Sequence, residues 1–296
     1  MPAYYPPSEL IINPDGSIYH LGVRPDEIGD IIITVGDQNR VPMISKHFDQ
    51  LEVQREKREF KTHTGLIGQK RITVISTGIG PDNIDIVINE LDALANIDLA
   101  RREAYQEHRT LTFIRLGTTG GLSKATPVDD IICSSFGLGF DNLLNFYDWE
   151  PNSAEQQMIN DWNSFVEKHQ FVLPMIPYAV EGSKDILQHL SDGYHKGITI
   201  TAPGFYAPQG RQLRASSRLS ATVMDGLRTF RSNDYAITNL EMETSAIYGL
   251  CRILGHQALS CNVVLANREN NTFSSDPKGA VENLIVKMLE RITTLP

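Results

Sequence analysis

The sequence predicts an α/β protein whose sheet is mixed or mostly parallel. Short, continuously apolar strands outnumber alternating ones, which is typical of strands buried on both faces. Helical patterns stand between these strands, as expected for a sheet covered by helices. The chain has 296 residues, of which 41% are hydrophobic and 21% are charged, so it can bury one large core in a single domain.

The individual elements follow from local patterns along the chain. Residues 1–17 contain several turn-forming residues and are expected to form an N-terminal arm before a domain of residues 18–296. Apolar side chains recur at helical spacing between residues 82 and 99. Strands are expected at residues 30–35, 71–77, 111–116, 130–134, 177–181, 197–202 and 258–266. Helices are expected at residues 41–48, 154–169, 240–254 and 277–292. The remaining segments are expected to be a polar hairpin at 56–65, a solvated connection at 101–109 and a loop at 137–152.

Composition excludes several classes of function. The net charge of −9 argues against a general nucleic-acid surface, so any phosphate must be held by a local arginine cluster. Cys133, Cys251 and Cys261 lack metal-binding spacing, which predicts reduced thiols in a cytoplasmic protein and no metal. The N-terminus lacks the basic and apolar regions of a signal peptide, and no apolar run is long enough to span a membrane.

The most prominent candidate site follows the strand at residues 111–116. Arg115 stands near its end, and a glycine-rich turn carrying Thr118 and Thr119 is expected after Leu116. Glycines let backbone N–H groups approach an anion, while the arginine adds a forked positive charge. A tight turn around a buried, paired arginine explains this stretch equally well.

Two further turns follow predicted strands. Gly36 and Arg40 would suit a phosphate, although a simple turn is the more common explanation. The Gly78-Ile79-Gly80 turn lacks the third glycine of a dinucleotide-binding fingerprint and is interrupted by Pro81, so NAD binding is not favoured.

Residues 205–211 predict a pocket for a pyrimidine base. Gln209 offers an acceptor and a donor in one plane and Arg211 offers a fork of donors, which together match the edge of uracil, while Phe205 could stack on the ring. A carboxylate within residues 241–245 could accept both ribose hydroxyls, and His20 could bind a sugar hydroxyl. Taken singly, these features also fit a surface loop, acids that favour a helix dipole, and a structural histidine.

Taken together, these segments resemble the family I nucleoside phosphorylases, and among them the uridine phosphorylases. The resemblance covers roughly residues 18–292, with every segment in the order found in the family. The segments that carry it are Tyr19–Gly22, Gly36–Val41, Arg58–Phe60, Ser76–Gly80, Ile114–Gly120, Phe205–Arg211 and Leu240–Glu243.

The resemblance implies a distorted, barrel-like sheet flanked by helices and a role for each matching residue. Arg115, Gln209 and Arg211 would act in catalysis. The implied phosphate contacts are Gly36, Arg40, Arg115 and Thr118, with Arg58 reaching the phosphate of a neighbouring subunit; the ribose contacts are Met242, Glu243 and His20, the last across the same interface; the base contacts are Thr119, Gly120, Phe205, Gln209 and Arg211.

The implied reaction converts uridine and orthophosphate reversibly to uracil and ribose 1-phosphate. It needs no metal or organic cofactor, and it implies a homo-oligomer, either a dimer or a hexamer built from dimers. Purine-specific relatives carry a Ser-Asp pair where this chain has Ala266-Asn267-Arg268. A purine nucleoside phosphorylase, a nucleosidase of the same fold and a non-catalytic nucleoside-binding protein are the alternatives. The choice between uridine, thymidine and deoxyuridine does not follow from the sequence.

Overall fold

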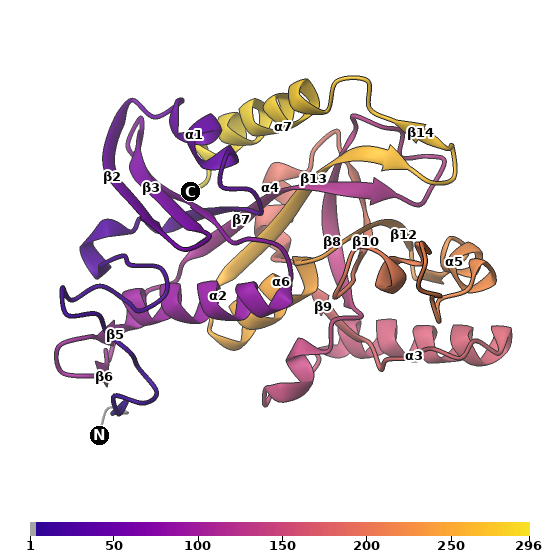
Figure 1. The fold of residues 1–296 in the computed structure, drawn as a ribbon, viewed down its shortest axis with the longest axis horizontal. Helices are drawn as coiled ribbons and strands as arrows, with labels where there is room; N and C mark the ends of the chain where they lie inside the picture. The colour runs from indigo at the N-terminus through magenta and orange to yellow at the C-terminus, as the bar shows by residue number, and fades with distance from the viewer. Residues whose placement is uncertain (1–3) are drawn as a thin grey trace. The chain divides into compact units, whose positions relative to one another are not determined.

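The computed structural model describes residues 4–296, so the first residues of the predicted arm lie outside it (Figure 1). The chain forms two compact units. The first unit extends to residue 115 and includes residues 250–258, and the second contains residues 116–249 and 259–296. The predicted domain of residues 18–296 stays a prediction.

The first unit is built on a sheet with a buried central strand. Strand β1 (Ile31–Val35) pairs in parallel with β4 (Lys70–Ser76) and with the first residues of β7 (Thr112–Gly121). Strand β3 (Phe60–Ile67) is antiparallel to β4 and to β2 (Gln50–Lys57). Every residue of β1 is buried, which explains its unbroken apolar and β-branched sequence. The unit also contains η1 (Pro25–Glu27), α1 (Arg40–Ser45), α2 (Pro81–Asn96), β5 (Ile97–Asp98) and β6 (Glu103–Ala104).

Helix α2 confirms the amphipathic helix predicted from spacing. Pro81 lies in its first turn, where a missing N–H costs no helical hydrogen bond. The side chains of Glu90 and Asp92 on this helix each contact a histidine ring nitrogen. The predicted apolar positions are all buried, namely Ile84, Val87, Ile88, Leu91, Leu94 and Ala95.

The second unit contains a mixed sheet that closes on itself. Strand β8 (Ile131–Gly139) is parallel to β10 (His195–Thr201), which is parallel to β12 (Tyr235–Glu241). Strand β13 (Gln257–Asn267) is antiparallel to β8, and β12 is antiparallel to the end of β7. Because β13 and β7 are also neighbours, these strands form a barrel-like circuit. The remaining elements are β9 (Tyr178–Glu181), β11 (Arg231–Ser232), β14 (Thr272–Phe273), η2 (Leu143–Phe146), η3 (Ala207–Gln209), α3 (Ser153–His169), α4 (Lys184–Leu190), α5 (Ala221–Leu227), α6 (Thr244–Ile253) and α7 (Pro277–Ile292).

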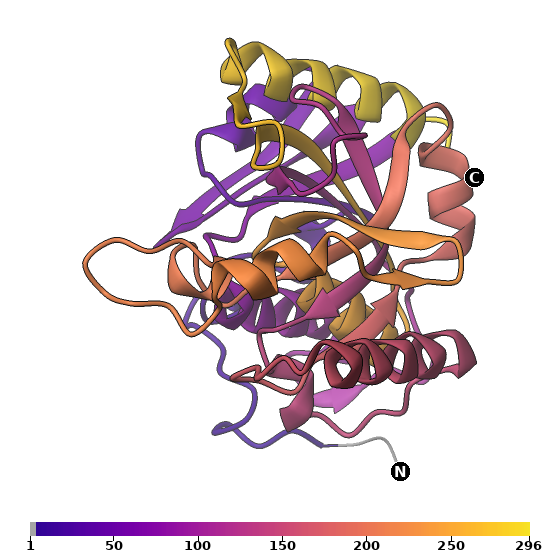
Figure 2. The same ribbon diagram turned by 90° about the vertical axis from the view of Figure 1, so that its right-hand side faces the viewer.

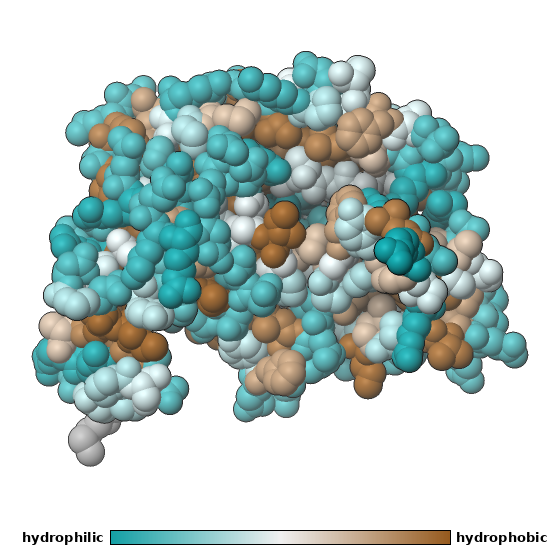
Figure 3. Space-filling model, viewed as in Figure 1, coloured by the Kyte–Doolittle hydropathy of each residue, from teal (hydrophilic) through white to brown (hydrophobic). Residues whose placement is uncertain are grey.

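The mixed α/β fold with a barrel-like sheet flanked by helices is therefore as predicted, and aromatic side chains fill the core of the second unit. Trp162 of α3 is 1% exposed, and its ring centroid lies 5.5 Å from that of Phe140 and 5.2 Å from that of Phe230. On the face drawn in Figure 3, exposed apolar side chains form small groups among polar ones.

Strand β7 does not break where a turn was predicted. It continues through Gly121, so the expected glycine turn after Leu116 is wrong. A Cβ on Gly121 would lie 2.9 Å from Nδ2 of Asn267 and 3.2 Å from the carbonyl oxygen of Thr126. Glycine is needed here for close packing within a continuous strand, and not for a turn.

Other boundaries also differ from the prediction. Strand β8 extends to Gly139, into the segment predicted as a loop. Residues 240 and 241 end strand β12, and helix α6 begins only at Thr244. Strands β5, β6, β11, β12 and β14 and helices α4 and α5 were not predicted, and β6 lies within the segment expected to be a solvated connection.

Gly137→Ala is expected to lower the free energy of unfolding by about 1–3 kcal/mol. A Cβ at this position of β8 would lie 2.7 Å from the Cα of Ser245, so the strand and the first turn of α6 would have to move apart. Urea unfolding measures the change. Ser135→Ala is the control on the same strand, because it removes a buried hydroxyl without a hydrogen-bond partner among residues 4–296. It should change stability by less than about 0.5 kcal/mol; equal effects of both variants would contradict the contact.

Candidate functional site

The predicted phosphate contacts of the first unit lie at the carboxyl ends of adjacent strands. Gly36 directly follows β1, and Arg40 is the first residue of α1. Arg115 on β7 pairs with Thr34 of β1 and is 6% exposed. Because paired strands lie about 4.8 Å apart, the backbone of these residues meets at one end of the sheet. This is the place where open α/β sheets bind ligands.

Tyr19 brings His20 and Arg58 together on the first unit. The Tyr19 and His20 rings meet edge to face with centroids 4.7 Å apart, and the guanidinium carbon of Arg58 lies 5.7 Å from the Tyr19 centroid. Lys57 holds Tyr19 in place, since its Nζ donates to the Tyr19 carbonyl oxygen at 2.5 Å. Arg58 is exposed in the turn between β2 and β3. These four residues, called the Tyr19 cluster below, thus contain both side chains predicted to act across a subunit interface.

In the second unit, three of the predicted base contacts, Phe205, Gln209 and Arg211, lie on the segment between β10 and α5, which extends away from the strands (Figure 2). The guanidinium carbon of Arg211 lies 3.7 Å from the ring centroid of Phe205. Nη1 of Arg211 donates to the carbonyl oxygen of Phe205 at 2.6 Å and to Oε1 of Gln209 at 2.5 Å. Gln209 is only 3% exposed, so its amide is held rigidly. The structure therefore brings these three predicted residues together.

A second arginine at this cluster was missed by the sequence reasoning. Arg268 donates through Nη1 to the carbonyl oxygen of Gln209 and through Nη2 to its Oε1 at 3.3 Å. Burial, followed by the positive charges of Arg211 and Arg228, lowers the pKa of Arg268 to about 10. The side chain therefore remains a cation at neutral pH, although its burial and the neighbouring positive charges disfavour the charged form. In the sequence, Arg268 belongs to the stretch Ala266-Asn267-Arg268, which the resemblance sets against the Ser-Asp pair of purine-specific relatives, and this difference is the signal that points to it.

The orientation of Gln209 changes what the pocket offers. Its Oε1 accepts hydrogen bonds from Arg211 and Arg268, which occupy both lone pairs of that oxygen. From the sequence, this oxygen is expected to be an acceptor for the base. In the structure, the Gln209 amide and the two guanidinium groups form a surface rich in donors, which suits carbonyl oxygens and negative charge.

The predicted ribose contacts lie at the start of α6. Glu243 is 3% exposed, and Met242 is half-buried. The carboxylate of Glu241 accepts the backbone N–H of Glu243 at 2.9 Å, the N–H of Thr244 at 3.0 Å and the hydroxyl of Thr201 at 2.7 Å. Glu241 thus supplies the acceptors that the first N–H groups of a helix need, and it fixes the backbone from which Glu243 projects.

Thr118, Thr119 and Gly120 lie on β7 in the second unit. The Thr119 hydroxyl donates to the carbonyl oxygen of Leu240 at 2.6 Å and accepts from Asn239, so it joins β7 to β12. Gly120 pairs with Leu240 in the same ladder. Thr118 is half-buried on this strand. Their roles in binding phosphate and base stay predictions.

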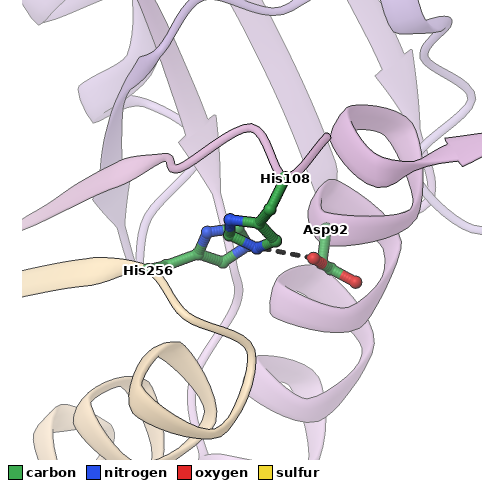
Figure 4. A group of neighbouring side chains, drawn as sticks. All are labelled: Asp92, His108 and His256. Atoms are coloured by element: carbon green, nitrogen blue, oxygen red, sulfur yellow. Dashed lines mark hydrogen bonds and ion pairs between the residues drawn. The ribbon is translucent and has the colours of Figure 1, made fainter. Parts of the chain in front are cut away.

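A cluster of two histidines and a carboxylate lies in the first unit, where His256, His108 and Asp92 face one another (Figure 4). Nδ1 of His256 accepts the backbone N–H of Leu111 at 3.1 Å, so its Nε2 carries the proton and donates to Oδ1 of Asp92 at 3.1 Å. Nε2 of His108 donates to the carbonyl oxygen of Leu254 at 2.9 Å. A metal ion on Nε2 of His256 would require the opposite tautomer, so these hydrogen bonds favour a structural role.

Comparison with known proteins identifies the family. Residues 30–294 match the Phosphorylase superfamily, and the chain belongs to it. A uridine phosphorylase of Thermococcus kodakarensis is 29% identical over 261 residues, which are 88% of this chain and 80% of that protein. A uridine phosphorylase of Escherichia coli is 25% identical, with 85% of this chain and 86% of that protein covered.

Solved structures agree with this assignment. A Trypanosoma brucei nucleoside phosphorylase, described as showing uridine phosphorylase activity, aligns with a TM-score of 0.83 and 29% identity over 97% of this chain and all of that one.

Among the sequence relatives, a purine nucleoside phosphorylase of Oceanobacillus iheyensis is also similar, with 26% identity over 81% of this chain and 83% of that protein. Among the described residues, no helix is long and apolar enough to cross a membrane.

Proposed function

We propose that the protein catalyses the reversible phosphorolysis of uridine to uracil and ribose 1-phosphate. Membership of the Phosphorylase superfamily supports the reaction class. The preference for a pyrimidine rests chiefly on Gln209, whose amide is held by the two guanidinium groups of Arg211 and Arg268. This arrangement suits the carbonyl oxygens of uracil, whereas a purine-specific pocket would need an acid to protonate the departing base.

Phosphate would act as the nucleophile without a metal or organic cofactor. In this proposal Gly36, Arg40, Arg115 and Thr118 hold the phosphate dianion below C1′ of the ribose. The bond between C1′ and N1 breaks early, and the phosphate stabilises the resulting oxocarbenium-like cation before it bonds to C1′. Each charge-assisted hydrogen bond to the phosphate is worth roughly 1.5–3 kcal/mol, so the loss of one arginine is expected to cost at least about tenfold in rate.

The departing uracil carries the negative charge in this mechanism. The guanidinium groups of Arg211 and Arg268 both donate to the amide oxygen of Gln209, and in this proposal the three side chains would stabilise the anionic base. Phe205 would stack on the base with its exposed ring, and the guanidinium carbon of Arg211 lies 3.7 Å from the centroid of that ring. Glu243 and Met242 would hold the ribose hydroxyls.

The active form would be a homo-oligomer in which each subunit contributes side chains to the active site of its neighbour. His20 and Arg58 both belong to the Tyr19 cluster, so one surface could deliver both side chains to a neighbouring subunit. His20 is half-buried and Arg58 is exposed, which supports this role. We also infer a cytoplasmic location, because the buried sulfur atoms of Cys133 and Cys261 lie 3.4 Å apart as thiols, which fits a reducing compartment.

A nucleoside panel with and without phosphate tests the proposed activity. Uridine is expected to release uracil only when phosphate is present, and chromatography of the free base measures this. Cytidine presents an amino group to the donors of Arg211 and Arg268, so it should react about 10⁴-fold more slowly. Release of uracil without phosphate would indicate a nucleosidase, faster cleavage of inosine would indicate a purine enzyme, and no release from any nucleoside would indicate a binding protein.

Arg268→Met should lower kcat for uridine by at least about tenfold, because it removes a charged donor from the group that receives the departing base. The matched control is Arg214→Met, since Arg214 is an exposed arginine on the segment between β10 and α5. Steady-state kinetics at saturating phosphate would measure both variants. An effect confined to KM would mean that Arg268 binds substrate and transition state equally well; equal losses in both variants would remove it from the base site.

A further inference from the structure

The backbone and ring of His20 are both bound by one carboxylate, that of Glu90 on α2 (Figure 1 labels this helix). Oε1 of Glu90 lies 2.6 Å from Nδ1 of His20. The backbone N–H of His20 donates to the same carboxylate at 2.9 Å, and the N–H of Leu21 donates to Oε2 at 2.9 Å. All of these groups belong to the first unit.

This arrangement fixes where the imidazole proton is. A carboxylate only accepts hydrogen bonds, so Nδ1 of His20 must carry the hydrogen that it shares with Glu90. In the neutral ring Nε2 is then an acceptor. Nε2 has no hydrogen-bond partner among residues 4–296, and the His20 side chain is 29% exposed while that of Glu90 is 13% exposed. Nε2 of His20 can therefore accept a hydrogen bond from a ligand. The Glu90 carboxylate, which determines the tautomer of the ring, is largely shielded from solvent.

We propose that Glu90 is a positioning residue that sets the hydrogen-bond polarity of the subsite for the 5′ substituent of the nucleoside. This inference rests on the proposed function, in which His20 contacts the ribose 5′ position across the subunit interface. With Nε2 as acceptor, the subsite favours a 5′ substituent that donates, such as a hydroxyl or an ammonium group. It disfavours a substituent that can only accept, such as a methyl ether.

Glu90→Gln should invert this preference. A carboxamide has one oxygen for the three N–H groups that the carboxylate now accepts, and its NH₂ group can instead donate to Nδ1 of His20. The neutral ring then carries its proton on Nε2, and the subsite becomes a donor. A 5′-hydroxyl can donate or accept, so uridine itself should be affected less than analogues of fixed polarity.

The test compares 5′-amino-5′-deoxyuridine with 5′-O-methyluridine as substrates of both proteins at pH 8. The ratio of their kcat/KM values is expected to fall at least about tenfold in Glu90→Gln relative to the unmodified protein. Because each analogue is compared between two proteins, a difference in bulk between the analogues cancels.

Asp92→Asn is the matched control. Asp92 lies on the same helix and its Oδ1 is 3.1 Å from Nε2 of His256, a histidine outside the proposed site. This variant also removes a carboxylate–imidazole bond from α2, but it should leave the analogue ratio unchanged. An equal change of the ratio in both variants would mean that α2 had simply been disturbed, and it would overturn the assignment of Glu90.

The tautomer of His20 provides a readout that does not depend on turnover. Long-range ¹H–¹⁵N correlation spectra, with the His20 signal assigned from His20→Gln, should show the proton on Nδ1 in the unmodified protein and on Nε2 in Glu90→Gln. Nε2 protonation in the unmodified protein would overturn the inference. Failure of the unmodified protein to cleave uridine would contradict the proposed function, whereas normal cleavage with an unchanged analogue ratio would contradict only the role of Glu90.

Discussion

Two arginines that share one buried amide are the interaction on which the functional assignment depends. Arg211 and Arg268 both donate to Gln209, and the nearby positive charges add to burial in lowering the pKa of Arg268. Holding the two positively charged guanidinium groups close together costs free energy, and an anion bound beside them offsets that cost. In the proposed reaction the base becomes an anion only when the glycosidic bond breaks, so this cost would be offset late in the reaction, when stabilisation accelerates the chemistry.

The residues proposed to contact the sugar are held by a different set of bonds. Glu241 ends β12 and accepts the first N–H groups of α6, so the strand and the helix are joined at the residue pair that precedes Glu243. Close contact between Gly137 and Ser245 sets the same helix against β8. In the first unit, pairing of β1 with β7 places Arg115 beside the strand that precedes Gly36. Both units thus use strand ends to carry charged side chains.

Local patterns were sufficient for features determined by burial along one element. The helical spacing of apolar residues in α2 and the β-branched run of β1 each indicate burial, and both elements were predicted from the sequence. Strand β12 was missed because the polar residues Thr238, Asn239 and Glu241 interrupt its apolar pattern. Their side chains are satisfied by partners on other strands, such as Thr199 for Asn239 and Thr201 for Glu241, which no local pattern can reveal.

The same limit applies to the site. Residues with motif neighbours, such as Gln209 and Arg211, were found in the sequence, and the structure brings them into contact. Arg268 is 59 residues from Gln209, and Glu90 is 70 residues from His20, so their contacts depend on tertiary packing alone. The glycines after Leu116 suggested a turn because glycine is common in turns, but the strand continues through them, and Gly121 serves close packing.

The ionisation of uracil bound to the protein tests the central claim most directly. Ultraviolet titration would follow the loss of the ring proton in bound and in free uracil, under conditions where the protein is saturated and stays folded. If Arg211 and Arg268 stabilise the anionic base, bound uracil should ionise at least about one pH unit below free uracil, which corresponds to about 1.4 kcal/mol. Ionisation at the same pH as free uracil, or at a higher pH, would contradict the account.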